Sequence, residues 1–111
     1  MDEPRTPDHV LADIRSTRTQ LLGGPDALYD NEVKAETAEL AAHKAEDLAF
    51  ISAEGSVEMR KAAARLAAEE DATKAVVARA AHNRAKALIR ALESSLMSLQ
   101  AELKWMKEEG L

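Results

Sequence analysis

The sequence of 111 residues contains no cysteine, only four glycines and only three aromatic residues, Tyr29, Phe50 and Trp105. Without cysteine, a disulfide framework, a thiol nucleophile and a thiolate zinc site are all excluded. With so few aromatic side chains, the chain can bury many small contacts but few large ones. A small core of this kind is marginal on its own, and oligomerisation is a common way to bury more apolar surface.

Long apolar runs are also missing. No run approaches the roughly 18 residues that a membrane span needs, and the polar start MDEPRTPDHV lacks the features of a signal peptide. We therefore expect a cytoplasmic protein that does not enter a membrane. The net charge of −5 argues against a general coat for nucleic acid. The abundant residues are alanine, glutamate, lysine, leucine and arginine, which favour helices, so the predicted fold class is all-α.

Start and stop signals divide the chain into three predicted helices within a single domain. Residues 1–6 are expected to be a flexible N-terminus. The first helix is predicted over residues 7–22, because Thr6 is a good N-cap and Pro7 suits the first helical position.

The second helix is predicted over about residues 25–54, with a start at Asp30 as the alternative because Asp30 and Asn31 could form a cap. The Gly-Gly-Pro sequence at 23–25 ends the first helix, and Gly23 is expected in the left-handed conformation that often follows a helix. The larger apolar residues of the second helix recur on one face, and alanines lie beside that face. The larger residues are Val33, Leu40, Leu48 and Ile51, and the alanines are Ala41, Ala45 and Ala49.

The third helix is predicted to run without a break over about residues 57–109, because this stretch contains neither glycine nor proline. Its first half is rich in alanine, which lets two helix axes approach closely. We therefore expect the second and third helices to form a long, coiled-coil-like antiparallel hairpin. A turn at Gly55 and Ser56 would close it, with Gly55 in the left-handed conformation and Ser56 as N-cap.

The second half of this long helix is rich in leucine, and the second helix is too short to cover it. Part of the cover can come from residues 7–22, and the rest from another copy of the chain, so the sequence predicts an oligomeric bundle. For Trp105 an equal alternative is packing beneath residues 7–22 of its own chain. The predicted interface for an oligomer or another protein consists of Leu88, Leu92, Leu96, Leu99, Leu103, Trp105 and Met106.

Charge is segregated along the chain. Residues 23–54 carry eight acids and two bases, whereas residues 57–90 carry eight bases and four acids. The plainer interpretation is that these segments are complementary neighbours. The alternative is that basic residues on one face of the third helix contact the phosphates of a nucleic acid, and the candidates are Arg79, Lys86 and Arg90.

Two further groups of residues could carry chemistry. The exposed amides at the start of the third helix could hold a phosphate, with Ser56, Arg60 and Lys61 as the candidate contacts. The second helix carries acids around a histidine without the Glu-x-x-His spacing of di-iron bundles, so we expect no metal site there. This acidic group consists of Glu36, Glu39, His43, Glu46 and Asp47. No catalytic motif is present, so we expect neither an enzyme nor a cofactor.

Three segments together resemble a known group of proteins. They are YDNEV at the start of the second helix, the turn GSVEMRKAAA, and the closing ALESSLMSLQAELKWMKEEG. The pattern resembles small helical-hairpin proteins that bacteriophages encode, especially phages of actinobacteria, often among genes for DNA recombination and replication. The resemblance covers about residues 29–109. It implies a small accessory protein in the host cytoplasm that acts through oligomers and partners, with no catalytic residues.

The sequence therefore predicts a non-enzymatic, homo-oligomeric helical accessory protein whose partners are itself and another protein. Two alternatives remain open. One is a nucleic-acid-binding accessory protein that uses the basic face of the third helix. The other is an inhibitor of a host DNA-binding protein that mimics DNA through the acidic face of the second helix.

Overall fold

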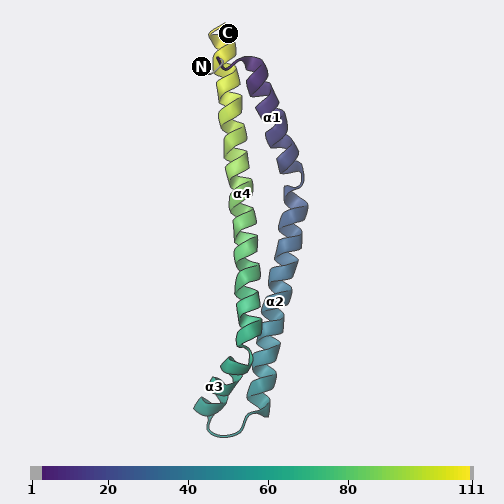
Figure 1. Ribbon diagram of the computed structural model, residues 1–111, viewed down its shortest axis with the longest axis vertical. Helices are drawn as coiled ribbons and strands as arrows, with labels where there is room; N and C mark the ends of the chain where they lie inside the picture. Colours follow the sequence, from purple (N-terminus) through teal and green to yellow (C-terminus); the bar gives the residue numbers. More distant parts are fainter. Residues whose placement is uncertain (1–3, 111) are drawn as a thin grey trace. The chain divides into compact units, whose positions relative to one another are not determined.

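The computed structural model describes residues 4–110, which contain four helices and no strand (Figure 1). The helices are α1 (Pro7–Leu22), α2 (Gly24–Ser52), α3 (Val57–Ala67) and α4 (Glu69–Glu108). The predicted all-α class is confirmed. The chain divides into two units. Unit 1 contains the chain up to Ala27 and from Ala85 onward, and unit 2 contains Leu28–Arg84.

Helix α1 has the bounds that the sequence predicts, because its start is set by local hydrogen bonds. The backbone N–H of His9 donates to the Thr6 hydroxyl at 3.4 Å, and the Thr6 N–H donates to Nδ1 of His9 at 3.2 Å. Pro7 lies at the start of the helix, where its missing N–H costs no hydrogen bond. The predicted flexible segment lies partly outside the described residues. Within it, Arg5 donates to Asp13 at 2.9 Å and to Glu102.

Only Gly23 separates α1 from α2, and its φ of −82° is right-handed, so the predicted left-handed conformation is wrong. The interruption follows instead from Pro25, which has no N–H to donate to the Leu21 carbonyl and whose ring prevents a regular helical turn. Gly24 allows a close approach, because a Cβ there would lie 3.1 Å from Cδ1 of Ile89.

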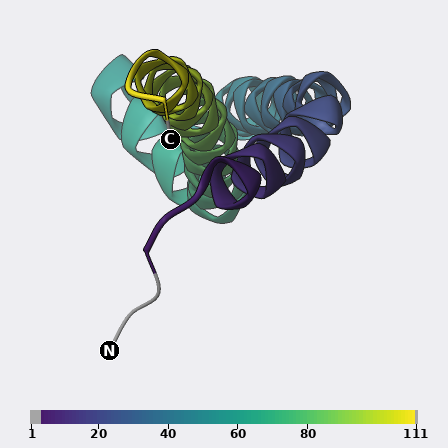
Figure 2. The same ribbon diagram turned by 90° about the horizontal axis from the view of Figure 1, so that it is seen from above.

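The core of unit 1 lies between α1 and the C-terminal part of α4, which run side by side (Figures 1 and 2). Val10, Ile14 and Met106 are buried together, and three leucines of α4 pack against them. Helix α1 therefore covers the leucine-rich face of α4 within the same chain. The three leucines are Leu96, Leu99 and Leu103.

In unit 2, α2 and the N-terminal part of α4 face each other through alanine. Ala35 of α2 and Ala75 of α4 are buried. Four further alanines of α2 are half-buried, namely Ala38, Ala42, Ala45 and Ala49. Small side chains on both helices allow their axes to lie close together. This supports the predicted pairing of alanine faces, while the coiled-coil character of the hairpin stays a prediction.

The larger apolar residues of α2 lie on its other side. Val33, Leu40, Leu48 and Ile51 are between 43% and 71% exposed, and Tyr29 on the same side is 71% exposed. At 3.6 residues per turn, this side points away from Ala35 and hence away from α4. We call these five residues the α2 outer face. The residues of the apolar face predicted for this helix are therefore exposed and do not form its contact with α4.

The uninterrupted helix predicted over residues 57–109 is wrong, because the chain bends at Ala68 between α3 and α4 (Figure 1). The backbone stays hydrogen-bonded on both sides of the bend, since Ala68 donates to Ala64 and Ala72 donates to Ala68. Three successive acids, residues 69–71, occupy the first turn of α4, and Arg65 lies in the last turn of α3. Charges at these places favour a helix end and a new helix start.

The loop before α3 follows the predicted chemistry. Gly55 has a φ of 105°, as expected for a left-handed position, and the Ser56 hydroxyl accepts a hydrogen bond from the Met59 N–H at 3.2 Å. Arg60 holds the loop to the end of α2. Its guanidinium donates to the Phe50 carbonyl at 3.1 Å and lies over the Phe50 ring, 4.4 Å from the centroid.

Candidate functional site

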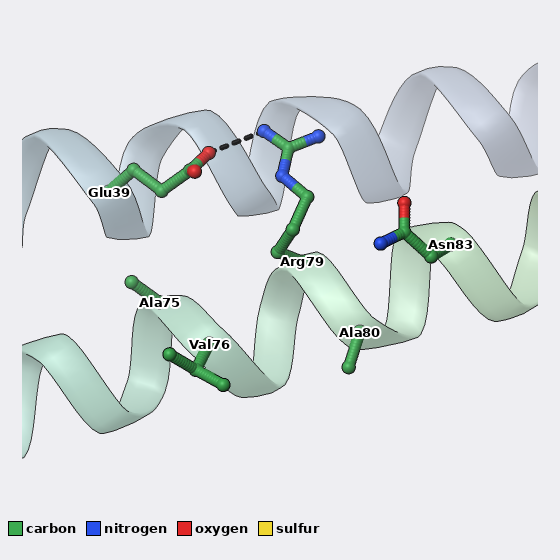
Figure 3. A pocket seen from close by; sticks show the side chains of 6 residues that line it. All are labelled: Glu39, Ala75, Val76, Arg79, Ala80 and Asn83. Atoms are coloured by element: carbon green, nitrogen blue, oxygen red, sulfur yellow. Dashed lines mark hydrogen bonds and ion pairs between the residues drawn. The ribbon is translucent and has the colours of Figure 1, made fainter.

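The best-formed polar cluster lies in unit 2 between α2 and α4. Arg79 of α4 reaches across to α2, where it binds Glu39 (Figure 3). It also binds Glu32 of α2, at 2.9 Å. Nε2 of His82, three residues further along α4, lies 2.7 Å from the same carboxylate of Glu32. Two acids of α2 are thus held by one arginine and one histidine of α4.

Charge pairing dominates the electrostatics of this cluster. The hydrogen bond from Arg79 is the largest cause that lowers the pKa of Glu32. Glu39 and then Glu32 raise the pKa of Arg79, because both carboxylates stabilise the charged guanidinium. His82 is 7% exposed, and its Nδ1 is buried without a hydrogen-bond partner among the described residues. Because the charges of Arg79, Glu32 and Glu39 are already paired, this cluster is better suited to aligning α2 with α4 than to chemistry on a substrate.

A shallow groove of about 360 Å³ lies beside the cluster. Figure 3 shows Arg79 pointing toward α2, while Val76 and Ala80 point away from it. An open hollow of this kind could seat a side chain from another protein, but it does not enclose a small molecule.

The three residues predicted to contact a nucleic acid differ in whether their charge is already paired within the chain. Arg79 is bound by two carboxylates and is therefore not a free cation for phosphate. Lys86 and Arg90 are exposed. The predicted basic face thus retains two exposed side chains of its three, and their contact with a nucleic acid stays a prediction.

The candidate anion contacts are each engaged locally. The Ser56 hydroxyl caps α3, and Arg60 is held by Phe50. Lys61 lies 4.0 Å from Glu58 one turn earlier, in a largely exposed pair. The side chains that were to hold a phosphate therefore have partners within the chain.

The acidic group on α2 is divided by the fold. Glu39 is bound to Arg79, whereas Glu36, His43, Glu46 and Asp47 are exposed. Within residues 4–110, no three carboxylate or histidine side chains come together in a way that could hold a metal ion.

The predicted oligomer interface is divided as well. Leu96, Leu99, Leu103 and Met106 pack beneath α1, and Leu92 is half-buried. Leu88 and Trp105 remain 59% and 56% exposed. Trp105 is therefore not packed beneath α1, which was the alternative for this residue. Whether any of these residues meets another chain stays a prediction.

Two surfaces were missed by sequence reasoning. One is the α2 outer face. Four of its five residues, all but Tyr29, had been assigned to the apolar face of the helix but not to its exposed side. The other is the side of α4 opposite α1, where Met97 is 70% exposed and Trp105 lies two turns further along. The spacing of Met97, Ala101 and Trp105, each four residues from the next, could have revealed this second surface.

The described part of the chain is thus a helical protein with a small core and extensive exposed apolar surface. Among residues 4–110, no helix combines the length and apolarity that crossing a bilayer requires. Comparison of the chain with protein-family models, curated proteins and solved structures found no match.

Proposed function

We propose that this chain is a non-enzymatic helical protein that assembles with copies of itself and acts by binding other proteins. The observation that carries the proposal is the distribution of its apolar side chains. Among residues 4–110, fourteen large apolar residues are exposed, whereas only three of the seven buried apolar residues are larger than alanine. A monomer would leave these fourteen side chains in contact with water, and an assembly could bury some of them.

The exposed area supports the same proposal. The chain has 8406 Å² of accessible surface at a mass of 12.1 kDa. The size scaling of folded proteins gives about 7,300 Å² in total for two separately folded bodies of half that mass. Burying a large aliphatic side chain contributes roughly 1.5–3 kcal/mol, so covering a few of these residues would stabilise an assembly appreciably.

The α2 outer face is one candidate surface for assembly. Leu40, Leu48 and Ile51 are 70%, 55% and 71% exposed, so each has much of its side chain left to bury. Lys44 and Asp47 lie among them and give the face charges that could select a partner.

The setting of the protein is also part of the proposal. Action in the cytoplasm of a phage host, beside DNA recombination or replication, rests on the resemblance of residues 29–109 to small phage proteins. Direct contact with nucleic acid is less supported, because Arg79 is already bound by Glu32 and Glu39. The proposal includes no catalytic residue and no cofactor.

Size-exclusion chromatography with light scattering tests self-assembly. We expect a mass that is a multiple of 12.1 kDa at micromolar concentration. Leu40→Asp should lower that mass if the α2 outer face is buried, since it would place an unpaired charge there, and Leu40→Met is the matched control. Leu96→Asp and Leu103→Asp would test folding rather than assembly, because these two leucines pack against the core of unit 1. A native monomer would refute the proposal.

A further inference from the structure

The side of α4 that faces away from α1 carries an exposed strip in unit 1. Met97, Ala101 and Trp105 follow one another at intervals of four residues, so they share one face of the helix. All three are exposed, and Met97 and Trp105 are the two large apolar residues among them. We call these three residues the α4 outer strip. Leu96 and Leu103, which pack beneath α1, lie on the other side of the helix.

Charged residues of both signs border this strip. Arg90 and Glu93 lie toward its N-terminal end, and Lys104 and Glu108 lie toward its C-terminal end. All four side chains are exposed, and none forms an ion pair with another described residue. The chain therefore leaves two positive and two negative groups beside an uncovered apolar strip.

Two copies of α4 that run antiparallel would place these charges next to charges of the opposite sign. If a second α4 runs antiparallel and both helices are centred on Leu99, then Arg90 lies level with Glu108 of the second copy, since each is nine residues from the centre. Glu93 then lies level with Lys104 of the second copy to within one residue, or about 1.5 Å. Each match occurs twice through the twofold symmetry, which gives four ion pairs of opposite charge.

The sizes of the side chains match in the same alignment. Met97 and Ala101 are each two residues from the centre, so the large side chain meets the small one. Trp105 comes level with Ser94 of the second copy, again to within one residue. A parallel pair would instead place Trp105 against Trp105 and Arg90 against Arg90.

We propose that the α4 outer strip binds a second copy of the chain, with the two α4 helices antiparallel and centred on Leu99. This inference rests on the proposed self-assembly of the chain, and it specifies which surface binds and how the two copies are oriented. Met97 and Ala101 would meet near the centre of the contact, Trp105 would be an apolar anchor on each side of that centre, and the bordering charges would select the orientation.

Charge reversal tests the alignment. Glu93→Lys and Lys104→Glu should each raise the dissociation constant of the dimer about tenfold, because each turns two attractive contacts into repulsive ones. The double variant exchanges the two signs and should bring the constant back to within about threefold of the native value. Lys107→Glu, an exposed change on another side of the same helix, is the control and should have little effect.

Cross-linking tests the orientation independently, because the native chain has no cysteine. A Met97→Cys chain mixed with an Ala101→Cys chain should form the mixed disulfide dimer in preference to either homodimer. Preference for a homodimer would overturn the antiparallel alignment. If the native chain assembles but neither single reversal weakens it, or the double variant does not recover, the proposed surface is wrong while self-assembly stands. A native monomer refutes both proposals.

Discussion

Truncating Ile14 tests the core of unit 1 most directly. This side chain is 4% exposed and is buried with Val10 and Met106. Replacing a buried isoleucine by alanine removes its apolar contacts and leaves a cavity, which together cost about 2–5 kcal/mol. The cluster is small and lies between only two helices, so partial collapse around the cavity favours a value near the middle, about 3 kcal/mol.

A loss of this size is large on the scale of a small domain. In a domain of 60–100 residues, 1 kcal/mol shifts the midpoint of thermal unfolding by roughly 4–8 °C. Ile14→Ala should therefore lower the midpoint by about 12 °C or more. Leu22→Ala is the matched control, because Leu22 lies on the same helix and is 81% exposed. Its effect should stay within about 0.5 kcal/mol.

The assay is thermal unfolding followed by circular dichroism at one fixed protein concentration, since self-assembly itself shifts the midpoint. Native-state hydrogen exchange shows where in the chain stability is lost, because it reports local opening amide by amide. In Ile14→Ala, protection should fall first in α1 and in the part of α4 that it covers. Equal midpoints for Ile14→Ala and Leu22→Ala would show that α1 does not pack on α4 as described.

Four other results are expected. Gly55→Ala should destabilise the chain by about 1–2 kcal/mol in urea unfolding, because a φ of 105° strains any side chain there. Gly23→Ala should stabilise it by about 0.4–1 kcal/mol in the same assay, because Gly23 is right-handed and open space surrounds it. The lowered pKa of Glu32 means that its contribution is fully present above the unfolded value of 4.5 and is lost as the pH falls through the folded value. Melting from pH 7 to pH 3 should therefore lose stability, with a smaller loss in Glu32→Gln, and equal slopes would contradict this. Fluorescence anisotropy of labelled single- and double-stranded DNA should show no binding at physiological salt, and salt-sensitive binding there would favour the nucleic-acid alternative.

Features set by local chemistry were predictable from the sequence. Thr6 and Pro7 determine where α1 begins, and Gly55 and Ser56 shape the loop before α3, because each acts through its own backbone or a neighbour one turn away. The segregation of charge also indicated that acids of α2 would face bases of α4, and Arg79 meets that expectation.

Features set by competition between packing surfaces were not predictable. Helix α2 has an alanine side and a side with larger apolar residues, and periodicity alone does not tell which one faces α4. In the structure the alanine side faces α4, so Ala35 is buried, whereas Leu40 on the other side is exposed. The bend at Ala68 was missed because it contains neither glycine nor proline, although the three acids that follow it were a usable signal.

The candidate binding surface of α4 was predicted only in part. The leucine spacing correctly marked an apolar face of α4, but it could not show that α1 of the same chain covers that face. Trp105 stayed exposed because it lies on the opposite side of the helix, which a linear count of apolar residues does not separate.

The alanine contact between α2 and α4 has a consequence for how this protein tolerates mutation. Ala35 is fully buried and Ala75 nearly so, hence any added carbon would have to push two helix backbones apart. Exposed Leu40 can change size without disturbing that contact. In a saturation mutagenesis screen that reports folding, buried Ala35 should thus accept the fewest replacements in α2, and the exposed leucines Leu40 and Leu48 should accept the most. A second screen that reports assembly should reverse this order for whichever leucines lie in the interface.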